Sequence, residues 1–254
     1  MPPAELEQFF HDHPRAALAF SGGTDSAYLL SAARAAGADL RAYFVKTAFQ
    51  PAFELADARR LAAELEVPLT VLEADILADP VVAANPPDRC YHCKKALFTR
   101  LCRQAAADGY PLVVDGTNAS DDAGDRPGMR ALRELGVRSP LRECGVTKAE
   151  VRRLSREAGL FTWDKPAYAC LATRVPAGEI ITAEKLARVE GAEGALAGLG
   201  FRDFRVRLLG ECARIQLPAG QLEEAARRRG EIRAALGPWF GEVLLDLRAR
   251  ELGT

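Results

Sequence analysis

The feature that most constrains the fold is a short apolar run that ends at two glycines and continues as a helical pattern. Residues 16–20 (AALAF) suit a buried strand, and Ser21 and the pair Gly22-Gly23 follow them. From residue 25 to residue 36 the apolar residues recur at helical spacing, and Gly37 ends the pattern. This segment is therefore expected to form a strand, a tight turn and a helix.

The alternation of apolar runs and helical patterns continues through the first two thirds of the chain. Further strands are predicted over residues 40–45, 69–72 and 112–114, and helices over residues 51–65 and 94–107. Strands that alternate with helices of about 10–15 residues pair in parallel. The predicted fold class is α/β, a doubly wound parallel sheet with its ligand site at the carboxyl ends of the strands.

Prolines and glycines interrupt the helical pattern between residues 160 and 180. A domain boundary is placed there, which gives a first domain of residues 1–165 and a smaller C-terminal α+β domain of residues 166–254. In the second domain, helices are predicted over residues 182–199, with Thr182 as N-cap, and 221–236, and strands over 204–209, 213–217 and 243–247.

Charge and cysteine content exclude several classes of protein. The 254 residues hold 34 Lys and Arg against 35 Asp and Glu, so no global basic field indicates binding to nucleic acid or to an anionic membrane. The apolar runs are far shorter than the roughly 18 residues that cross a bilayer. Six cysteines are too few for a disulfide scaffold, and the first residues show no basic-then-apolar signal pattern. A cytoplasmic protein is expected, in which clustered cysteines bind metal or carry sulfur chemistry.

Residues 20–26 (FSGGTDS) carry the sharpest functional signal. Glycines let the backbone pass close to a ligand, and the amides of the first helical turn, with the hydroxyls of Ser21 and Ser26, can surround a phosphate. The loop has neither the Gly-Lys-Ser/Thr of a Walker loop nor the spacing of a dinucleotide-binding loop. A simple capped turn is the alternative interpretation. The serines, glycines and Asp25 together favour an anion site.

The sequence has a single C-x-x-C pair, Cys90 and Cys93, in residues 89–95 (RCYHCKK). Two thiolates can hold one metal ion, but a tetrahedral zinc site needs two more ligands, and no second C-x-x-C is present. Three further cysteines stand alone and are expected to behave as small buried hydrophobes: Cys102, Cys144 and Cys212.

Cys170 differs from the isolated cysteines because it lies in a non-helical, cation-bearing stretch, residues 165–174 (KPAYACLATR). Neighbouring Lys and Arg side chains favour the thiolate, which is the reactive form of cysteine. From the residues alone, a reactive thiol and a buried thiol both stay open.

Five segments together resemble the LarE sulfur transferases, which belong to the PP-loop ATP pyrophosphatases. In chain order these segments are SGGTDS, RCYHCKKALF, VVDGTNASDDAGDRPGMRAL, GVTKAEVRRLSREAGLFTWDKPAYACLATRVPAGE and FRVRLLGECARIQL. The resemblance extends from about residue 15 to residue 250. One departure is Thr24, where the family usually has Val. Enzymes of this family make the thiocarboxylates of the nickel-pincer nucleotide cofactor.

The resemblance implies an ATP site at the glycine turn. It assigns the β and γ phosphates, with the help of Mg²⁺, to Ser21, Gly22, Gly23, Asp25 and Ser26. It also implies nucleotide contacts from the ends of two other strands, at Val45, Lys46, Gly116, Thr117 and Asn118. The paired acids Asp121 and Asp122 are candidate Mg²⁺ ligands, and Asp122 is taken as the metal residue.

The resemblance also implies the substrate and the sulfur chemistry. The substrate would be a pyridinium mononucleotide with two ring carboxylates, each activated as an acyl-adenylate before sulfur displaces AMP. Family members with three cysteines bind a [4Fe–4S] cluster, which here would be held by Cys90, Cys93 and Cys170 and supplied with sulfur by sulfide or a donor protein. In the alternative, Cys170 gives up its own sulfur and becomes dehydroalanine, and Cys90 and Cys93 form a loose pair or a zinc site shared with His92. The family further implies a homo-oligomer, a hexamer.

Four arginines are candidates to bind the substrate phosphate. Arg205 and Arg207 alternate along one predicted strand and would point to the same face, with Arg174 and Arg214 as further planar donors. A solvated strand face is the alternative interpretation. Lys148 and Lys165 are weaker candidates for the same role, because lysines near a helix start or a turn are usually solvated.

Three other functions remain open. PP-loop tRNA thiolases combine ATP with three cysteines, but they normally carry basic RNA-binding elements or zinc ribbons, which this sequence lacks. An amidating PP-loop synthetase would have no need of the three cysteines. A non-catalytic nucleotide-binding module with a structural zinc would have no need of the acid and both serines of the loop.

Overall fold

The computed structural model describes residues 2–121 and 127–251. The chain forms two compact units, of which the first comprises Met1–Ile76 and Asp88–Lys165 and the second Leu77–Pro87 and Pro166–Thr254. Residues 77–87, which lie within the N-terminal part of the sequence, thus belong to the second unit. The chain passes between the units at residues 76/77, 87/88 and 165/166.

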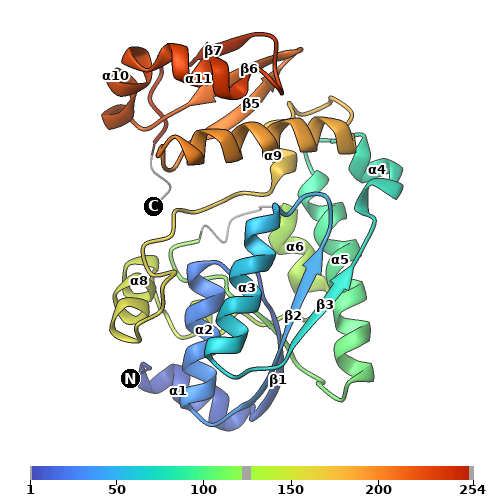
Figure 1. The fold of residues 1–254 in the computed structure, drawn as a ribbon. Helices are drawn as coiled ribbons and strands as arrows, with labels where there is room; N and C mark the ends of the chain where they lie inside the picture. Colours follow the sequence, from blue (N-terminus) through green and yellow to red (C-terminus); the bar gives the residue numbers. More distant parts are fainter. Residues whose placement is uncertain (1, 122–126, 252–254) are drawn as a thin grey trace. The chain divides into compact units, whose positions relative to one another are not determined.

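The first unit is built on a parallel sheet of four strands (Figure 1). The strand order is β3-β2-β1-β4, and the strands are β1 (Arg15–Ala19), β2 (Asp39–Lys46), β3 (Leu69–Glu73) and β4 (Val113–Asp115). Ala17 lies opposite Arg41 of β2 and Val113 of β4, so β1 is central and its carboxyl end stands between those of its two neighbours. This is the edge at which a doubly wound sheet places its ligand.

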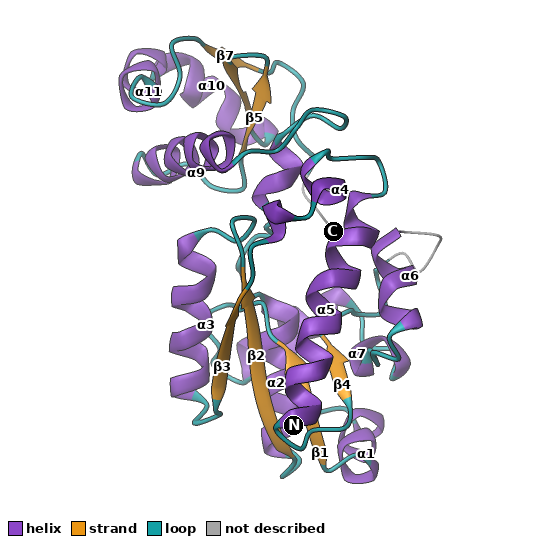
Figure 2. Ribbon diagram, turned by 90° about the vertical axis from the view of Figure 1, so that its right-hand side faces the viewer, coloured by secondary structure: helices purple, strands orange, loops and turns teal. Residues whose placement is uncertain are grey.

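Helices cover both faces of this sheet (Figure 2). They are α1 (Ala4–Asp12), α2 (Thr24–Ala35), α3 (Ala52–Glu64), α5 (Arg89–Ala107), α6 (Pro127–Glu134), α7 (Pro140–Glu143) and α8 (Lys148–Glu157). Leu18 packs in one core with residues of α1, α2, α3 and α8, whereas its neighbour Ala17 packs in another with residues of α5 and α6. Side chains of a strand alternate between faces, so apolar residues at both positions bury both sides of the sheet. The predicted α/β class is confirmed.

The second unit has a mixed three-stranded sheet. Its strands, in the order β5-β6-β7, are β5 (Arg205–Leu209), β6 (Cys212–Gln216) and β7 (Val243–Leu245), with β5 and β6 antiparallel and β6 and β7 parallel. The helical elements are η1 (Ile76–Ala78), which begins at the last residue of the first unit, α4 (Pro80–Ala83), η2 (Leu171–Arg174), α9 (Ala183–Gly198), α10 (Ala219–Arg227) and α11 (Arg229–Leu236). Thr182 caps α9 as predicted, because its Oγ1 accepts a hydrogen bond from the amide of Lys185 at 3.2 Å.

Two predicted helices differ from the observed ones. The predicted helix over residues 221–236 is two helices, because Arg228 leaves helical geometry (ψ 20°) and its guanidinium donates to the carbonyl of Leu199 at 3.0 Å. Helix α5 begins at Arg89 instead of residue 94, so the C-x-x-C pair lies inside its first turns. In residues 2–121 and 127–251, no helix combines the length and apolar character that crossing a membrane requires.

Candidate nucleotide site and sulfur-transfer cysteines

The turn between β1 and α2, residues 20–23, requires glycine at position 22. Gly22 has φ +69°, and a Cβ atom there would lie 3.0 Å from the backbone nitrogen of Ala58 and the carbonyl oxygen of Glu54, both in α3. A side chain is therefore excluded by conformation and by space. The turn packs its backbone directly against α3, and this fixes the direction in which α2 leaves the sheet.

The first turn of α2 offers backbone amides and two hydroxyls to a ligand. The N-cap residue is Gly23, which has no side chain to satisfy those amides. Ser21 Oγ lies 3.1 Å from Ser26 Oγ and accepts a hydrogen bond from the amide of Gly23 at 3.3 Å. A helix N-terminus of this kind suits a phosphate because its amides and its dipole both favour negative charge.

Asp25 is held on two sides at this site. Its Oδ1 accepts from Asn118 Nδ2 at 3.2 Å, and its Oδ2 accepts from Lys148 Nζ at 2.6 Å. The side chains of Lys148 and Asp25 are only 16% and 26% exposed. Lys148, a weaker candidate from the sequence, is therefore not solvated but enclosed beside the acid of the loop.

The end of β4 packs against the same helical turn. A Cβ atom on Gly116 would lie 2.9 Å from the amide nitrogen of Ser26, so only glycine permits this approach. Asp115 accepts from Thr117 Oγ1 at 2.6 Å and from Ser139 Oγ at 2.7 Å, which fixes the strand end. The structure thus brings the predicted segments 21–26 and 116–118 together.

The other predicted nucleotide residues lie at the end of β2, which pairs with β1 on the side opposite β4. The side chain of Val45 packs against the core on the α5 and α6 side, so a nucleotide contact at this residue would use its backbone. Lys46 Nζ donates to the carbonyl of Gln50. Of the paired acids, Asp121 accepts from the amide of Asn118 at 2.9 Å, and Asp122 lies outside the described residues.

A second lysine meets the loop from the end of the first unit. Lys165 Nζ donates to Asp57 Oδ2 at 2.6 Å and to the carbonyl of Gly22 at 3.3 Å, and its side chain is 17% exposed. Thr24 Oγ1 donates to the carbonyl of Thr162 at 2.8 Å. Lys165, like Lys148, is therefore not solvated, and no local pattern in the sequence indicates either contact.

The three candidate sulfur residues are thiols on two different elements. Cys90 is exposed and Cys93 is half-buried in the first turns of α5, where Arg89 Nη2 lies 3.8 Å from Cys90 Sγ. Cys170 belongs to the second unit, is half-buried and directly precedes η2. Among the described residues no group of three or more His, Cys, Asp or Glu side chains is gathered as a metal site.

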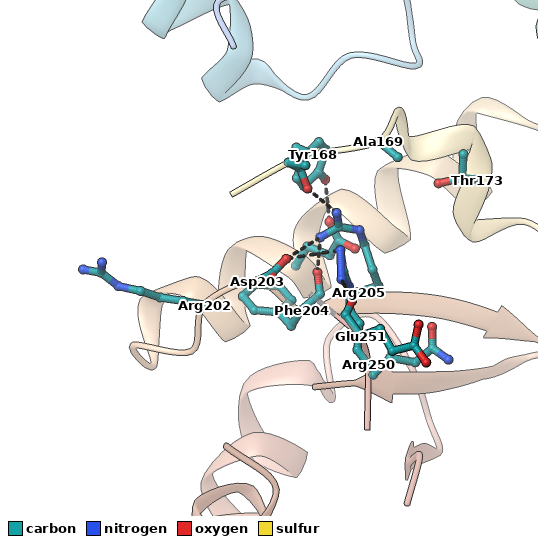
Figure 3. A network of polar contacts seen from close by, with 12 residues as sticks. Tyr168, Ala169, Thr173, Arg202, Asp203, Phe204, Arg205, Arg250 and Glu251 are labelled. Carbon is teal, nitrogen blue, oxygen red and sulfur yellow. Dashed lines mark hydrogen bonds and ion pairs between the residues drawn. The ribbon is translucent and has the colours of Figure 1, made fainter. Parts of the chain in front are cut away.

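The second unit gathers the predicted phosphate-binding arginines with two acids that the sequence did not single out. Arg174 and Glu193 form a buried ion pair at 2.9 Å, with side chains 0% and 5% exposed. Figure 3 shows Arg205 beside Tyr168 and Asp203, and Asp203 also pairs with Arg250 at 3.2 Å. Burial, with the nearby charges of Arg174 and Arg250, lowers the pKa of Arg205 to about 10.

Arg207 and Arg214 face each other across β5 and β6. Arg207 donates to Gln216 Oε1 and to the carbonyl of Thr173, each at 2.7 Å, and burial next to Arg174 and Arg214 lowers its pKa. Arg214 is 39% exposed and lies 3.8 Å from Asp246. Packing these cations together favours an anion at their exposed side.

Comparison with known proteins identifies relatives that match most of the chain. It is 36% identical over 221 residues to the pyridinium-3,5-bisthiocarboxylic acid mononucleotide synthase of Lactiplantibacillus plantarum, covering 86% of this chain and 80% of that one. It is 42% identical over 223 residues to an uncharacterised protein of Synechocystis (86% and 82% covered) and 32% identical over 190 residues to one of Methanocaldococcus jannaschii (75% and 72%). No protein-family model matches the chain. The identity to the synthase over most of both sequences shows that the chain belongs to the LarE family.

Proposed function

We propose that this enzyme is an ATP-dependent sulfur transferase that converts the two carboxylates of pyridinium-3,5-biscarboxylate mononucleotide into thiocarboxylates. The observation that carries the proposal is the glycine turn before α2, where Asp25 lies between Asn118 and Lys148. A chain with this site is 36% identical to a synthase named for the bisthiocarboxylic acid mononucleotide.

The residues at the turn fit ATP and Mg²⁺. The amides of α2 and the hydroxyls of Ser21 and Ser26 would bind the β and γ phosphates, and Lys148 would add a positive charge next to them. Carboxylate oxygens are the ligands that Mg²⁺ prefers, and Asp25 and Asp122 are the candidates. When bound, the metal ion would neutralise phosphate charge.

The reaction balances without a redox partner. A substrate carboxylate oxygen attacks the α-phosphorus of ATP, pyrophosphate leaves, and an acyl-adenylate forms. A sulfur nucleophile then attacks the acyl carbon, a C–S bond forms, the C–O bond to the nucleotide breaks, and AMP leaves. The same two steps, adenylation and sulfur transfer, then take place at the second carboxylate. Activation is needed because a free carboxylate is a poor acceptor of nucleophiles.

We assign the substrate phosphate to the arginines of the second unit. Arg214, whose side chain is 39% exposed, and the half-buried Arg207 opposite it would bind the phosphate directly. Arg174 is enclosed by Glu193 and backbone carbonyls, and Arg205 is buried as well. These two arginines would support the site without contacting the phosphate.

For the sulfur donor we propose a [4Fe–4S] cluster on Cys90, Cys93 and Cys170. All three residues are thiols with at least partial exposure, which suits thiolate ligation. Cys90 and Cys170 also lie within five residues of the points, 87/88 and 165/166, where the chain passes between its units. When bound, such a cluster would supply sulfide at an iron without a protein ligand.

The proposal is tested by following both half-reactions in one assay with ATP, Mg²⁺, the biscarboxylate mononucleotide and sulfide. We expect substrate-dependent pyrophosphate release and a product with the mass of a thiocarboxylate. Cys170→Ala should keep pyrophosphate release and lose the thiocarboxylate. Cys212→Ala is the matched control, because hydrogen bonding to Glu242 raises the pKa of that thiol and makes it a poor nucleophile. Wild-type protein that releases no pyrophosphate would overturn the proposal.

A further inference from the structure

The last residue of the first unit, Lys165, makes three contacts at the loop of residues 20–26, which we call the phosphate loop because it would bind the phosphates of ATP. Its ammonium donates to the carbonyl of Gly22 at 3.3 Å and to Asp57 Oδ2 at 2.6 Å, and it lies 5.2 Å from the centre of the Phe53 ring. The side chain is 17% exposed. A flexible lysine held in this way links the backbone of the loop to the end of the unit.

A second contact holds the same segment to the loop. Thr24 Oγ1, 4% exposed as a residue, donates to the carbonyl of the fully buried Thr162 at 2.8 Å. Within the segment, the amide of Lys165 donates to the carbonyl of Thr162 at 3.1 Å, so these residues form a closed turn. Two positions of the loop, Gly22 and Thr24, therefore fix the turn that ends the unit.

Two residues after Lys165, the chain is held by hydrogen bonds to residues of the second unit. The carbonyl of Ala167 accepts from Arg205 Nη2 at 2.5 Å. The carbonyls of Ala169 and Cys170 accept from Arg174 Nη1 at 2.7 and 3.3 Å. Only Pro166 separates the two anchored parts, and its ring restricts φ. Five residues of fully extended chain span about 18 Å, so Cys170 must lie within that distance of Lys165.

We infer that Lys165 is a positioning residue that ties the placement of Cys170 to the phosphate loop. The inference rests on the proposed function. The carbonyl of Gly22 belongs to the loop whose amides would face the phosphates, so bound nucleotide fixes the peptide to which Lys165 donates. Through the short, doubly anchored linker, this constrains Cys170 relative to the adenylate. Without the contact, the adenylate still forms, but water attacks it before sulfur does and returns carboxylate and AMP.

The measurable consequence is the number of thiocarboxylates formed per pyrophosphate released. A misplacement of about 1 Å can slow a reaction roughly a hundredfold, so Lys165→Met should lower this ratio by about ten- to a hundredfold. Pyrophosphate release itself should change by less than about threefold, because no phosphate contact is removed. Lys165→Arg, which keeps the charge and donors, should restore most of the ratio. Lys185→Met, which removes an ion pair with Glu179 at the surface, should leave it unchanged.

A structural role alone would reduce both half-reactions together and leave the ratio at the wild-type value, which would overturn the inference. Asp57→Ala, which removes the carboxylate that holds the Lys165 ammonium at 2.6 Å, gives an independent version of the test if Lys165→Met folds poorly, and it too should lower the ratio. Hydrogen exchange gives a readout without turnover. A non-hydrolysable ATP analogue should slow exchange in residues 160–170 of the wild type but not of Lys165→Met, and equal slowing would also overturn the inference. Failure of wild-type pyrophosphate release would instead contradict the proposed function.

Discussion

At the scale of single residues, the positive charge beside the glycine turn of residues 20–26 comes from outside the turn. A Walker loop carries its own lysine, whereas residues 20–26 here contain none. Lys148, the first residue of α8, brings its ammonium to Asp25 at 2.6 Å instead. The capping box formed by Thr147 and Glu150 fixes the start of that helix. The lysine is therefore held in place before any nucleotide binds.

Lys148→Met should weaken the use of ATP. Hydrogen bonds to charged groups contribute about 1.5–3 kcal/mol, so kcat/KM for ATP should fall roughly 10- to 150-fold. Pyrophosphate release measured against ATP concentration checks this, with Lys185→Met as the control for loss of a surface lysine. An unchanged kcat/KM for ATP would show that Lys148 only balances the charge of Asp25.

No local pattern in the sequence could assign either lysine to the site. Lys148 and Asp25 are 123 positions apart, and Lys165 and Gly22 are 143 positions apart. A lysine has a long side chain, and which partner it meets is decided by how α8 and the 160–165 turn pack on the sheet. The glycines and serines of the loop were predictable because their chemistry is contained in six consecutive residues.

At the scale of elements, the site depends on the close approach of β4 to the first turn of α2. Gly116 is the point of contact, since a Cβ atom there would lie 2.9 Å from Ser26 N and 3.1 Å from Ser26 Cα. Both atoms belong to the backbone of the helix, so a side chain could only be accommodated by moving the helix start.

Gly116→Ala should therefore destabilise the fold and raise the KM for ATP. Overpacking of this kind costs about 1–3 kcal/mol, which a denaturant titration of the free energy of unfolding measures. Gly194→Ala is the matched control, because a Cβ atom on that exposed position of α9 meets nothing within 4 Å. It should be neutral or stabilising by up to about 1 kcal/mol. Equal stability of the two variants would contradict the close approach.

The strands of the first unit were predictable because they are apolar on both faces, as parallel strands between helix layers must be. Helix limits were less predictable. No bounds were predicted for helix α8, although Thr147 and Glu150 carry a capping signal. The break at Arg228 could not be predicted, because it depends on a contact to Leu199 across 29 positions.

At the scale of the whole molecule, the cysteines are divided between the two units of the chain. Protein purified without oxygen should contain about four iron and four sulfide per chain, as expected for one [4Fe–4S] cluster. Cys90→Ala and Cys170→Ala should each lose this content, and Cys212→Ala should keep it. Wild-type protein without iron after reconstitution, with dehydroalanine at position 170 after one turnover, would show that Cys170 is a sacrificial sulfur donor.

The central claim is that ATP activates the substrate as an acyl-adenylate. The most direct test uses substrate labelled with oxygen-18 in its carboxylates and follows the label into the products by mass spectrometry. Because the carboxylate oxygen bonds to the α-phosphorus and stays there when sulfur enters, we expect one labelled oxygen in each AMP and none in pyrophosphate. Label in inorganic phosphate, or AMP without label, would contradict adenylation and with it the proposed reaction.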